Sequence, residues 1–599
     1  MWMIRSWCGV ALTALAAFCA QPVCAQNTGL IYRGSFETVA DAPATDAEAA
    51  RFLTQATFGP TVAEIARLRG IGYSQWLEQQ LSMPPTLTGP WLDALVANPD
   101  FSLNSGHRVD RWWVQAVFGQ DQLRQRMAWA LSQIMVTADS GGIDTRMIAE
   151  YADLLTRNAF GSYRTLLGDV TFSPTMGQWL TYVRNRASYS TGTPPTTILP
   201  DENYAREVMQ LFSFGLIKRN LDFSPQLSGG NPIPTYDNTI IGSLARVFTG
   251  LSYERTNYTG TSFGNNTNRN LLAPMICFPM NNPPNNQNYL AGGRTFHDFA
   301  GKTLFDGITL PAVADSQAGC AQDINAALDA IANHASVAPF ISRQLIQRFV
   351  TSNPSPAYIQ RVATRFNNNG QGVRGDLAAV ITAVLMDTEA RSAPSGNFGK
   401  LREPVLRLTA LWRGLDLLQV KPEPPLNGSG GTNTNVGNIS MSLGFDSSLG
   451  QRPYNSPTVF NFYEPDFRNP GAIQNANLYS PEFQILNEST ITRMNDTIQS
   501  RIVDWYVGSS SCNTVTRPCV PIAPYLAIMQ QPGNATTYGQ LVDALNLRMM
   551  AGAMSSNMRS VLVTMLSNQT APTTDSARID RIRQVMRVIV VSPEFAVQK

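Results

Sequence analysis

Residues 200–215, PDENYAREVMQLFSFG, predict the helix around which we expect the rest of the chain to be organised. Pro200 disfavours an earlier helical start, and the Asp201 carboxylate can accept hydrogen bonds from the first-turn amides of a helix that begins at Glu202. Apolar residues then recur at three- and four-residue spacing, which makes one continuous stripe that needs a core to pack against. The stripe consists of Tyr204, Val208, Leu211, Phe212 and Gly215.

The other side of this helix carries polar groups. Glu202 and Arg206 are four residues apart in the order that favours an ion pair, while Asn203 and Glu207 share a flank between the stripe and solvent. Such a helix can bring carboxylate, amide and guanidinium groups into a cleft. It can equally be an ordinary buried helix with a polar edge, so both interpretations stay open.

The stretch PDENYAREVMQLFSFGL resembles the signature helix of the bacterial family catalogued as domain of unknown function 1800, whose members are mostly exported and largely helical. Three later segments look like the same family: IIGSLARVFTG at 240–250, FHDFAGKTLFDG at 296–307 and NHASVAPFISRQLIQRFV at 333–350. The resemblance implies an architecture and a compartment but no established reaction. It also implies a partner, because family members are often encoded beside an exported sulfatase-like protein.

We therefore expect an all-α fold in which residues 46–599 form one large multihelical domain. The chain is 43% hydrophobic, which is enough to bury a sizeable core, and it shows no internal repeat of fixed period. Stretches rich in Asn, Gly and Pro predict long loop insertions near residues 252–295, 421–450 and 505–540.

Residues 1–25 have the features of a secretory signal peptide: Arg5 provides the positive start, an apolar run follows, and the small-residue sequence VCA ends at Ala25. We expect cleavage after Ala25, a flexible segment over residues 26–45, and a periplasmic or secreted product. No later stretch has the roughly 18 uninterrupted apolar residues of a membrane span, so we expect no transmembrane anchor after cleavage.

Charge and cysteine content narrow the function classes further. Loss of the signal peptide lowers the formal net charge from +2 to about +1, which argues against a nucleic-acid partner because such binding needs many Lys and Arg contacts to phosphate. Four cysteines remain in the mature chain, an even set for disulfides in an oxidising compartment. We expect Cys512 to pair with Cys519 and Cys277 with Cys320, although other pairings stay open.

A second group of polar residues follows the first insertion. His297, Asp298 and Lys302 place a proton carrier, a carboxylate and an ammonium within six residues. Together with the 200–215 helix they can form a site in which His297 moves a proton and Glu207 or Asp298 is its orienting acid. The alternative is that all of them form buried structural pairs. The substrate-binding candidates are Asn203, Arg206 and Lys302.

No cofactor and no metal site is expected. The chain has three histidines and lacks the CxxCH sequence of haem attachment. GTSFG at 260–264 formally matches GxSxG, but neither a strand before Ser262 nor a helix after it is indicated. Residues 367–376 superficially resemble a calcium loop, but Ala378 stands where the bidentate acid belongs, so we interpret them as an interhelical turn.

Two functions remain. The first is an exported binding, scaffold or assembly protein of the cell envelope, with the sulfatase-like protein as its partner. The second is a periplasmic or secreted hydrolase that uses carboxylates and a His on a polymeric or saccharide substrate, which would require two acids about 5 to 9 Å apart in a cleft.

Overall fold

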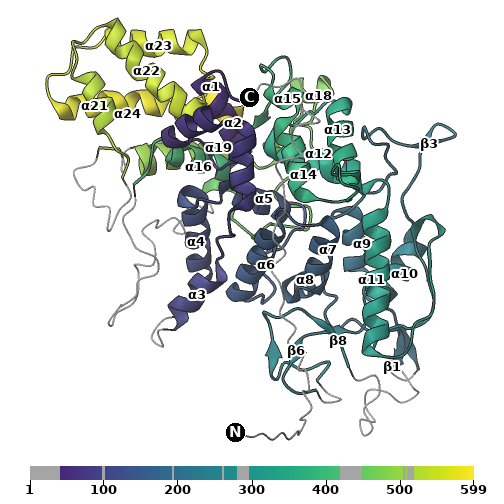
Figure 1. The fold of residues 1–599 in the computed structure, drawn as a ribbon. Helices are drawn as coiled ribbons and strands as arrows, with labels where there is room; N and C mark the ends of the chain where they lie inside the picture. The colour runs from purple at the N-terminus through teal and green to yellow at the C-terminus, as the bar shows by residue number, and fades with distance from the viewer. Residues whose placement is uncertain are drawn as a thin grey trace, which may run out of the picture.

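A computed structural model describes residues 41–97, 102–191, 194–258, 262–279, 296–418, 448–503, 507–508 and 519–599. The described part is predominantly helical, and its strands are two or three residues long (Figure 1). The expected all-α fold is therefore confirmed. The predicted signal peptide lies outside the described residues, as do most of residues 26–45 and 421–450.

The first part of the chain is a series of helices joined by short loops. They are α1 (Asp46–Ala56), α2 (Val62–Ser82), α3 (Gly89–Val96), α4 (Ser105–Phe118), α5 (Gln122–Ser132), α6 (Thr145–Asn158), α7 (Tyr163–Phe172) and α8 (Pro174–Trp179). Thr45 and Thr61 cap α1 and α2, because their hydroxyls accept from the amides of Glu48 and Glu64 at 3.2 and 3.1 Å. Helix α1 packs on α2, and α5 packs on α6.

The predicted central helix is α9 (Asn203–Gln210). It begins one residue later than expected, and Asp201 still accepts a hydrogen bond from the Asn203 amide at 2.8 Å. Its apolar stripe is in the core: Tyr204 and Val208 are fully buried, and the Tyr204 ring stacks on Tyr182 with centroids 4.0 Å apart.

Gly215 ends the turn that follows α9. Its φ of +76° lies in the left-handed region, and its amide donates to the carbonyl of Met209 at 3.0 Å. A Cβ at this position would lie 3.0 Å from the ring of Phe340. Glycine therefore lets the end of α9 approach the helix that carries Phe340.

The strands form two-stranded antiparallel hairpins and pairs at the edges of the helical body. They are β1 (Tyr189–Thr191) with β2 (Thr196–Ile198), β3 (Leu227–Ser228) with β4 (Asn231–Pro232), β5 (Leu251–Ser252) with β8 (Ile276–Cys277), β6 (Glu254–Arg255) with β7 (Arg269–Asn270), β9 (Lys302–Thr303) with β10 (Thr309–Leu310), and β11 (Lys400–Leu401) with β12 (Val597–Gln598). The described part of the predicted 252–295 insertion is built from four of these strands. Ser262 lies in a turn there, beside a small cluster of buried Phe263, Phe278 and Phe296.

The helices after α9 complete the body. They are α10 (Asn238–Val247), α11 (Gln317–Asn333), α12 (Val337–Phe349), α13 (Pro356–Asn367), α14 (Leu377–Met386), α15 (Thr388–Arg391) and α16 (Pro404–Gly414), with a 3-10 turn η2 (Phe305–Gly307). Residues 367–376 form the predicted interhelical turn, in which Asp376 caps α14 by accepting from the Ala379 amide at 3.1 Å. In Figure 1, α9, α10 and α11 lie together on the right-hand side.

The remaining elements are α18 (Ala472–Asn475), η3 (Pro481–Gln484), α19 (Glu488–Thr497), η4 (Ile498–Val503), α21 (Ala523–Met529), α22 (Ala535–Met550), α23 (Ser556–Ser567), α24 (Asp575–Val591) and α25 (Pro593–Ala596). Of these, α21, α22, α23 and α24 lie together at the upper left of Figure 1, whereas α18 lies near α15. One hydrophobic cluster includes buried residues from α1 through to α25. Among the described helices, none is both long and apolar enough to cross a membrane.

Candidate functional site

The polar side of α9 reaches the surface. Arg206 and Glu202 form the predicted ion pair at 3.6 Å, with 42% and 45% of their side chains exposed. Such a surface pair contributes little to stability. Asn203 is half-buried at the first position of the helix. Both substrate-binding candidates on α9 are therefore accessible to solvent.

Glu207 differs from these neighbours because it is buried, with 6% of its surface exposed. Its Oε2 atom has no hydrogen-bond partner within the described residues. Burial raises the pKa of Glu207 above its usual range, and the nearby Arg206 opposes that shift only in part. A buried acid with a raised pKa is a feature that general acids in active sites share.

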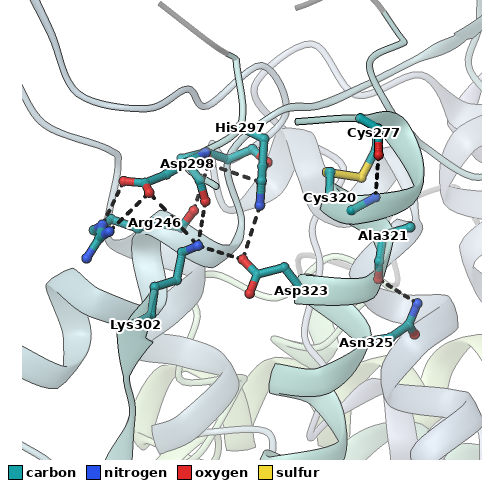
Figure 2. Close-up of a disulfide and its surroundings, with 12 residues drawn as sticks. Arg246, Cys277, His297, Asp298, Lys302, Cys320, Ala321, Asp323 and Asn325 are labelled. Atoms are coloured by element: carbon teal, nitrogen blue, oxygen red, sulfur yellow. Dashed lines mark hydrogen bonds and ion pairs between the residues drawn. A yellow bond between two sulfur atoms is a disulfide. The ribbon is translucent and has the colours of Figure 1, made fainter. Parts of the chain in front are cut away.

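His297, Asp298 and Lys302 come together around Asp323 of α11 (Figure 2). The Nε2 atom of His297 lies 3.1 Å from Oδ2 of Asp323, and Nδ1 lies 2.8 Å from the carbonyl oxygen of Thr249. Both ring nitrogens therefore lie within hydrogen-bonding distance of an oxygen atom. The side chains of His297 and Asp323 are 2% and 1% exposed.

Lys302 is the second partner of Asp323. Its fully buried ammonium donates to Asp323 at 2.7 Å, to the carbonyl of Ala300 at 2.9 Å and to the carbonyl of Asp298. An ammonium has three N–H donors, so these acceptors satisfy all of them. The network fixes residues 297–302 against α11.

Asp298 is held by a cation from another helix. Arg246, in the last turn of α10, donates to its two carboxylate oxygens at 2.7 and 3.0 Å. Burial alone would raise the pKa of Asp298, but the hydrogen bonds and charge of Arg246 and the charge of Lys302 lower it. Asp298 is therefore an ionised partner in this network.

The contacts thus place the six predicted site residues in two groups. Helix α10 contacts both α9 and β9, so it connects the group on α9 with the group around Asp323. The catalytic roles of Glu207, His297 and Asp298 and the substrate-binding roles of Asn203, Arg206 and Lys302 stay predictions.

The predicted disulfide between Cys277 and Cys320 is confirmed. It joins β8 to the first turn of α11, three residues before Asp323, as Figure 2 shows. Cys519 is also disulfide-bonded, and its predicted partner Cys512 lies outside the described residues. Within the described part of the chain, no group of three or more His, Cys, Asp and Glu side chains is placed to hold a metal ion.

A cavity of about 300 Å³ opens where the turn after α9, helix α12 and residues 459–466 meet. Its lining includes the apolar side chains of Phe214, Leu216, Phe340 and Phe460. Leu216 and Phe460 are 54% and 47% exposed, so apolar surface is accessible to solvent here. A concave site with this lining and size lies at the small end of known ligand pockets.

Arginines and aromatic rings alternate in a row that begins in the cavity lining, at Arg219, Phe223 and Arg343, and continues beyond it. The guanidinium carbons of Arg219 and Arg343 lie 4.4 and 4.6 Å from the ring centroid of Phe223. Those of Arg343 and Arg468 lie 4.7 and 4.6 Å from the ring centroid of Tyr479. Stacking of this kind orients a guanidinium group while its N–H edge can still donate.

Arg343 and Asp466 form an ion pair of 2.6 Å at the cavity, with side-chain exposures of 4% and 61%. Arg343 also donates to the carbonyl of Pro465 at 3.3 Å. The buried cation is therefore balanced by a carboxylate that water largely surrounds.

A buried hydrogen-bond network connects the cavity lining, at Tyr463 and Gln133, to Glu403 in the core. Tyr463 donates to Oε1 of Gln133 at 2.6 Å, and Nε2 of Gln133 donates to Glu403 at 2.7 Å. Glu403 is fully buried and also accepts from Trp129 at 3.0 Å and from Gln451 at 2.6 Å. Since each of these groups has a partner, the network holds the cavity wall in one arrangement.

Sequence reasoning missed this cavity. The site residues predicted from the sequence lie on the 200–215 helix and within residues 297–302, and none of them lines the cavity. A signal was present in the helical sequence ISRQLIQRF, because Arg343 and Arg348 lie among its apolar residues, and both are nearly fully buried. Buried arginines need acceptors from other segments.

Comparison with known proteins gives one finding about the family. The model of the family described as "Protein of unknown function (DUF1800)" matches residues 51–597. No curated protein and no solved structure matches the chain. The match includes α9, α12 and the 459–466 segment, so every wall of the cavity lies inside it.

Proposed function

The chain belongs to the family of proteins of unknown function DUF1800, and from that premise we propose that it is an exported binding or assembly protein of the cell envelope. Its ligand or partner enters the cavity between α9, α12 and residues 459–466. The proposal goes beyond the family description, which assigns neither a compartment nor a ligand.

One observation carries the proposal: the cavity combines exposed apolar side chains with buried cations. Leu216 and Phe460 expose apolar surface, while Arg343 is 4% exposed and Arg348 is 2% exposed. Binding sites commonly have this composition, in which apolar groups supply affinity and a few oriented polar groups supply specificity.

The proposals that the chain is exported and that it has a protein partner are supported mainly by the sequence. The signal-peptide pattern of residues 1–25 supports a periplasmic or secreted product. A disulfide between Cys277 and Cys320 suits an oxidising compartment. The family resemblance supports an exported sulfatase-like protein, encoded nearby, as the partner.

Cell fractionation and affinity capture test the two halves of this proposal. The mature chain is expected in the periplasm or the medium with Gln26 as its first residue, and uncleaved chain in the cytoplasm would contradict export. Captured from the envelope fraction, the wild-type chain should retain the sulfatase-like protein. Phe460→Asp should lose it, whereas Val588→Asp, at a position 37% exposed on α24, should retain it.

The hydrolase alternative is favoured by one observation, the buried Glu207 with its raised pKa. In that function Glu207 is the general acid for a polymeric or saccharide substrate. A panel of polysaccharides should then release reducing ends with the wild-type chain and with Glu202→Gln, but not with Glu207→Gln. Absence of release by the wild-type chain would end this alternative.

A further inference from the structure

We propose that the cavity binds a carboxylate attached to an apolar body, and that the Asp466 side chain occupies the carboxylate position until this ligand arrives. The inference rests on the proposed function, because it names the ligand class of the same cavity. Two sources share this chemistry: a small aryl or alkyl acid, and the C-terminal residue of a peptide with an apolar side chain.

The charge of the cavity favours an anion. Arg219, Arg343 and Arg348 line it, against the acids Glu464 and Asp466. Arginine presents a planar fork of N–H donors that matches a carboxylate. The contacts of Arg219 and Arg343 with the Phe223 ring, at 4.4 and 4.6 Å, hold two of these forks in place before a ligand arrives.

The Arg343–Asp466 pair indicates where the carboxylate goes. Arg343 is buried and needs an acceptor, and its carboxylate partner is 61% exposed on the 459–466 segment. A buried cation gains from any carboxylate that reaches it. An exposed side chain can turn into water at little cost, so a ligand carboxylate can take its place.

The apolar body is inferred from the remaining lining. Phe214, Leu216, Phe340 and Phe460 come from the turn after α9, from α12 and from the 459–466 segment. A ligand that carried charge alone would leave Leu216 and Phe460, which are 54% and 47% exposed, in contact with water. A ligand with an aromatic or aliphatic body of a few carbon atoms would bury them.

Calorimetric titration of the mature chain with three probes of similar size tests the ligand class. The probes are 3-phenylpropionate, 3-phenylpropionamide and 3-phenylpropylamine, which carry charges of −1, 0 and +1. The acid is expected to bind at least about tenfold tighter than the amide or the amine, as expected for one charge-assisted hydrogen-bonded pair. Equal binding of the three, tighter binding of the amine, or no binding of the acid would overturn the inference.

Variants of the ion pair make the test sharper. Asp466→Asn removes the internal competitor, so it should tighten binding of 3-phenylpropionate by about tenfold. Asp329→Asn is the matched control, because Asp329 pairs with Arg164 at the same 2.6 Å and is 62% exposed, and it should change nothing. Weaker binding by Asp466→Asn would contradict the assigned position.

Arg343→Gln should abolish binding of the acid. If that variant does not fold, Arg343→Lys keeps the charge without the planar fork and should still lose about tenfold. Unchanged binding by Arg343→Lys would argue against a role for the guanidinium fork.

A peptide pair separates the two sources of the carboxylate. N-acetyl-Ala-Ala-Phe with a free C-terminus should bind tighter than 3-phenylpropionate if the ligand is a protein terminus, and more weakly if it is a small acid. Its C-terminal amide should bind in neither case, and binding of the amide would count against the inference. Failure of all acids, with Phe460-dependent capture of the envelope partner retained, would remove the ligand class and leave the proposed function standing.

Discussion

Tyr463 donates its phenolic hydrogen to Oε1 of Gln133 at 2.6 Å, which ties the 459–466 segment to the C-terminal end of α5 across 330 residues of sequence. Both residues line the cavity. The wall of the cavity is thus an extension of the buried network rather than an independent loop.

Tyr463→Phe should lower the free energy of unfolding by about 1–2 kcal/mol, because the Gln133 acceptor is left buried without this donor. Chemical denaturation measures the change. Tyr479→Phe is the control, since Tyr479 is half-buried and its ring remains in place for Arg343 and Arg468. Equal unfolding free energies for Tyr463→Phe and the wild type would show that the bond does not stabilise the wall.

Glu403→Gln should be more damaging. Glu403 is fully buried and accepts hydrogen bonds from Trp129, Gln133 and Gln451. In the variant, the NH2 group of the glutamine amide would face one or more of these three N–H donors. We therefore expect the free energy of unfolding to fall by about 3 kcal/mol or more. Glu464→Gln, at an exposed position, should cost little in the same denaturation experiment, and a similar loss in both variants would contradict this account.

The disulfide should stabilise the contact between β8 and α11. It joins cysteines 43 residues apart, and the loop-entropy argument gives a contribution of about 4 kcal/mol. We expect Cys277→Ser with Cys320→Ser to lower the thermal midpoint of the mature chain. Cys277→Ser alone should lower the thermal midpoint by a similar amount, because loss of one cysteine already removes the disulfide. A midpoint equal to that of the wild type would argue that the disulfide does not stabilise this contact.

The free energy of unfolding should decrease as the pH is lowered, because of His334. Its Nδ1 accepts from the Ser336 amide at 3.2 Å, and its Nε2 faces Asp306 at 3.3 Å. Burial lowers the pKa of His334 to about 4 against the opposing charge of Asp306, with Lys218 and Arg374 adding to the lowering. A second proton on the ring would also displace the Ser336 hydrogen bond.

The sign of the effect follows from this lowered pKa. In the unfolded chain His334 has an ordinary histidine pKa near 6.5, whereas in the folded chain it binds a proton only near pH 4. Between these pH values the unfolded chain therefore binds more protons than the folded chain. Stability is therefore complete above pH 6.5 and is lost as the pH falls toward 4, by at most about 3 kcal/mol. His334→Gln should flatten this part of the pH profile, and His107→Gln should leave most of it. Parallel profiles for His334→Gln and the wild type would contradict the assignment.

The helices could be predicted from the sequence because their signals are local. The apolar stripe of residues 204–215 and the cap at Asp201 lie within a few turns of one another, and α9 formed almost where they indicated. His297, Asp298 and Lys302 could be placed together for the same reason, since six residues of chain include all three.

The partners of these residues could not be predicted. Asp323 lies 26 residues after His297, and Arg246 lies 52 residues before Asp298. Arg343 and Asp466 are 123 residues apart, so only the packing of α12 against the 459–466 segment creates their pair. Periodicity shows which face of a helix is buried, but it does not show which distant acceptor a buried cation meets.

The most direct test of the central claim is photo-cross-linking in intact cells with p-benzoylphenylalanine in place of Phe460. The account predicts an adduct with the exported sulfatase-like protein that is absent when the same amino acid replaces Val588 and is lost when Leu216→Asp is added. Identical adducts at both positions, or none with an exported protein at Phe460, would contradict the claim that the cavity after α9 is the binding site.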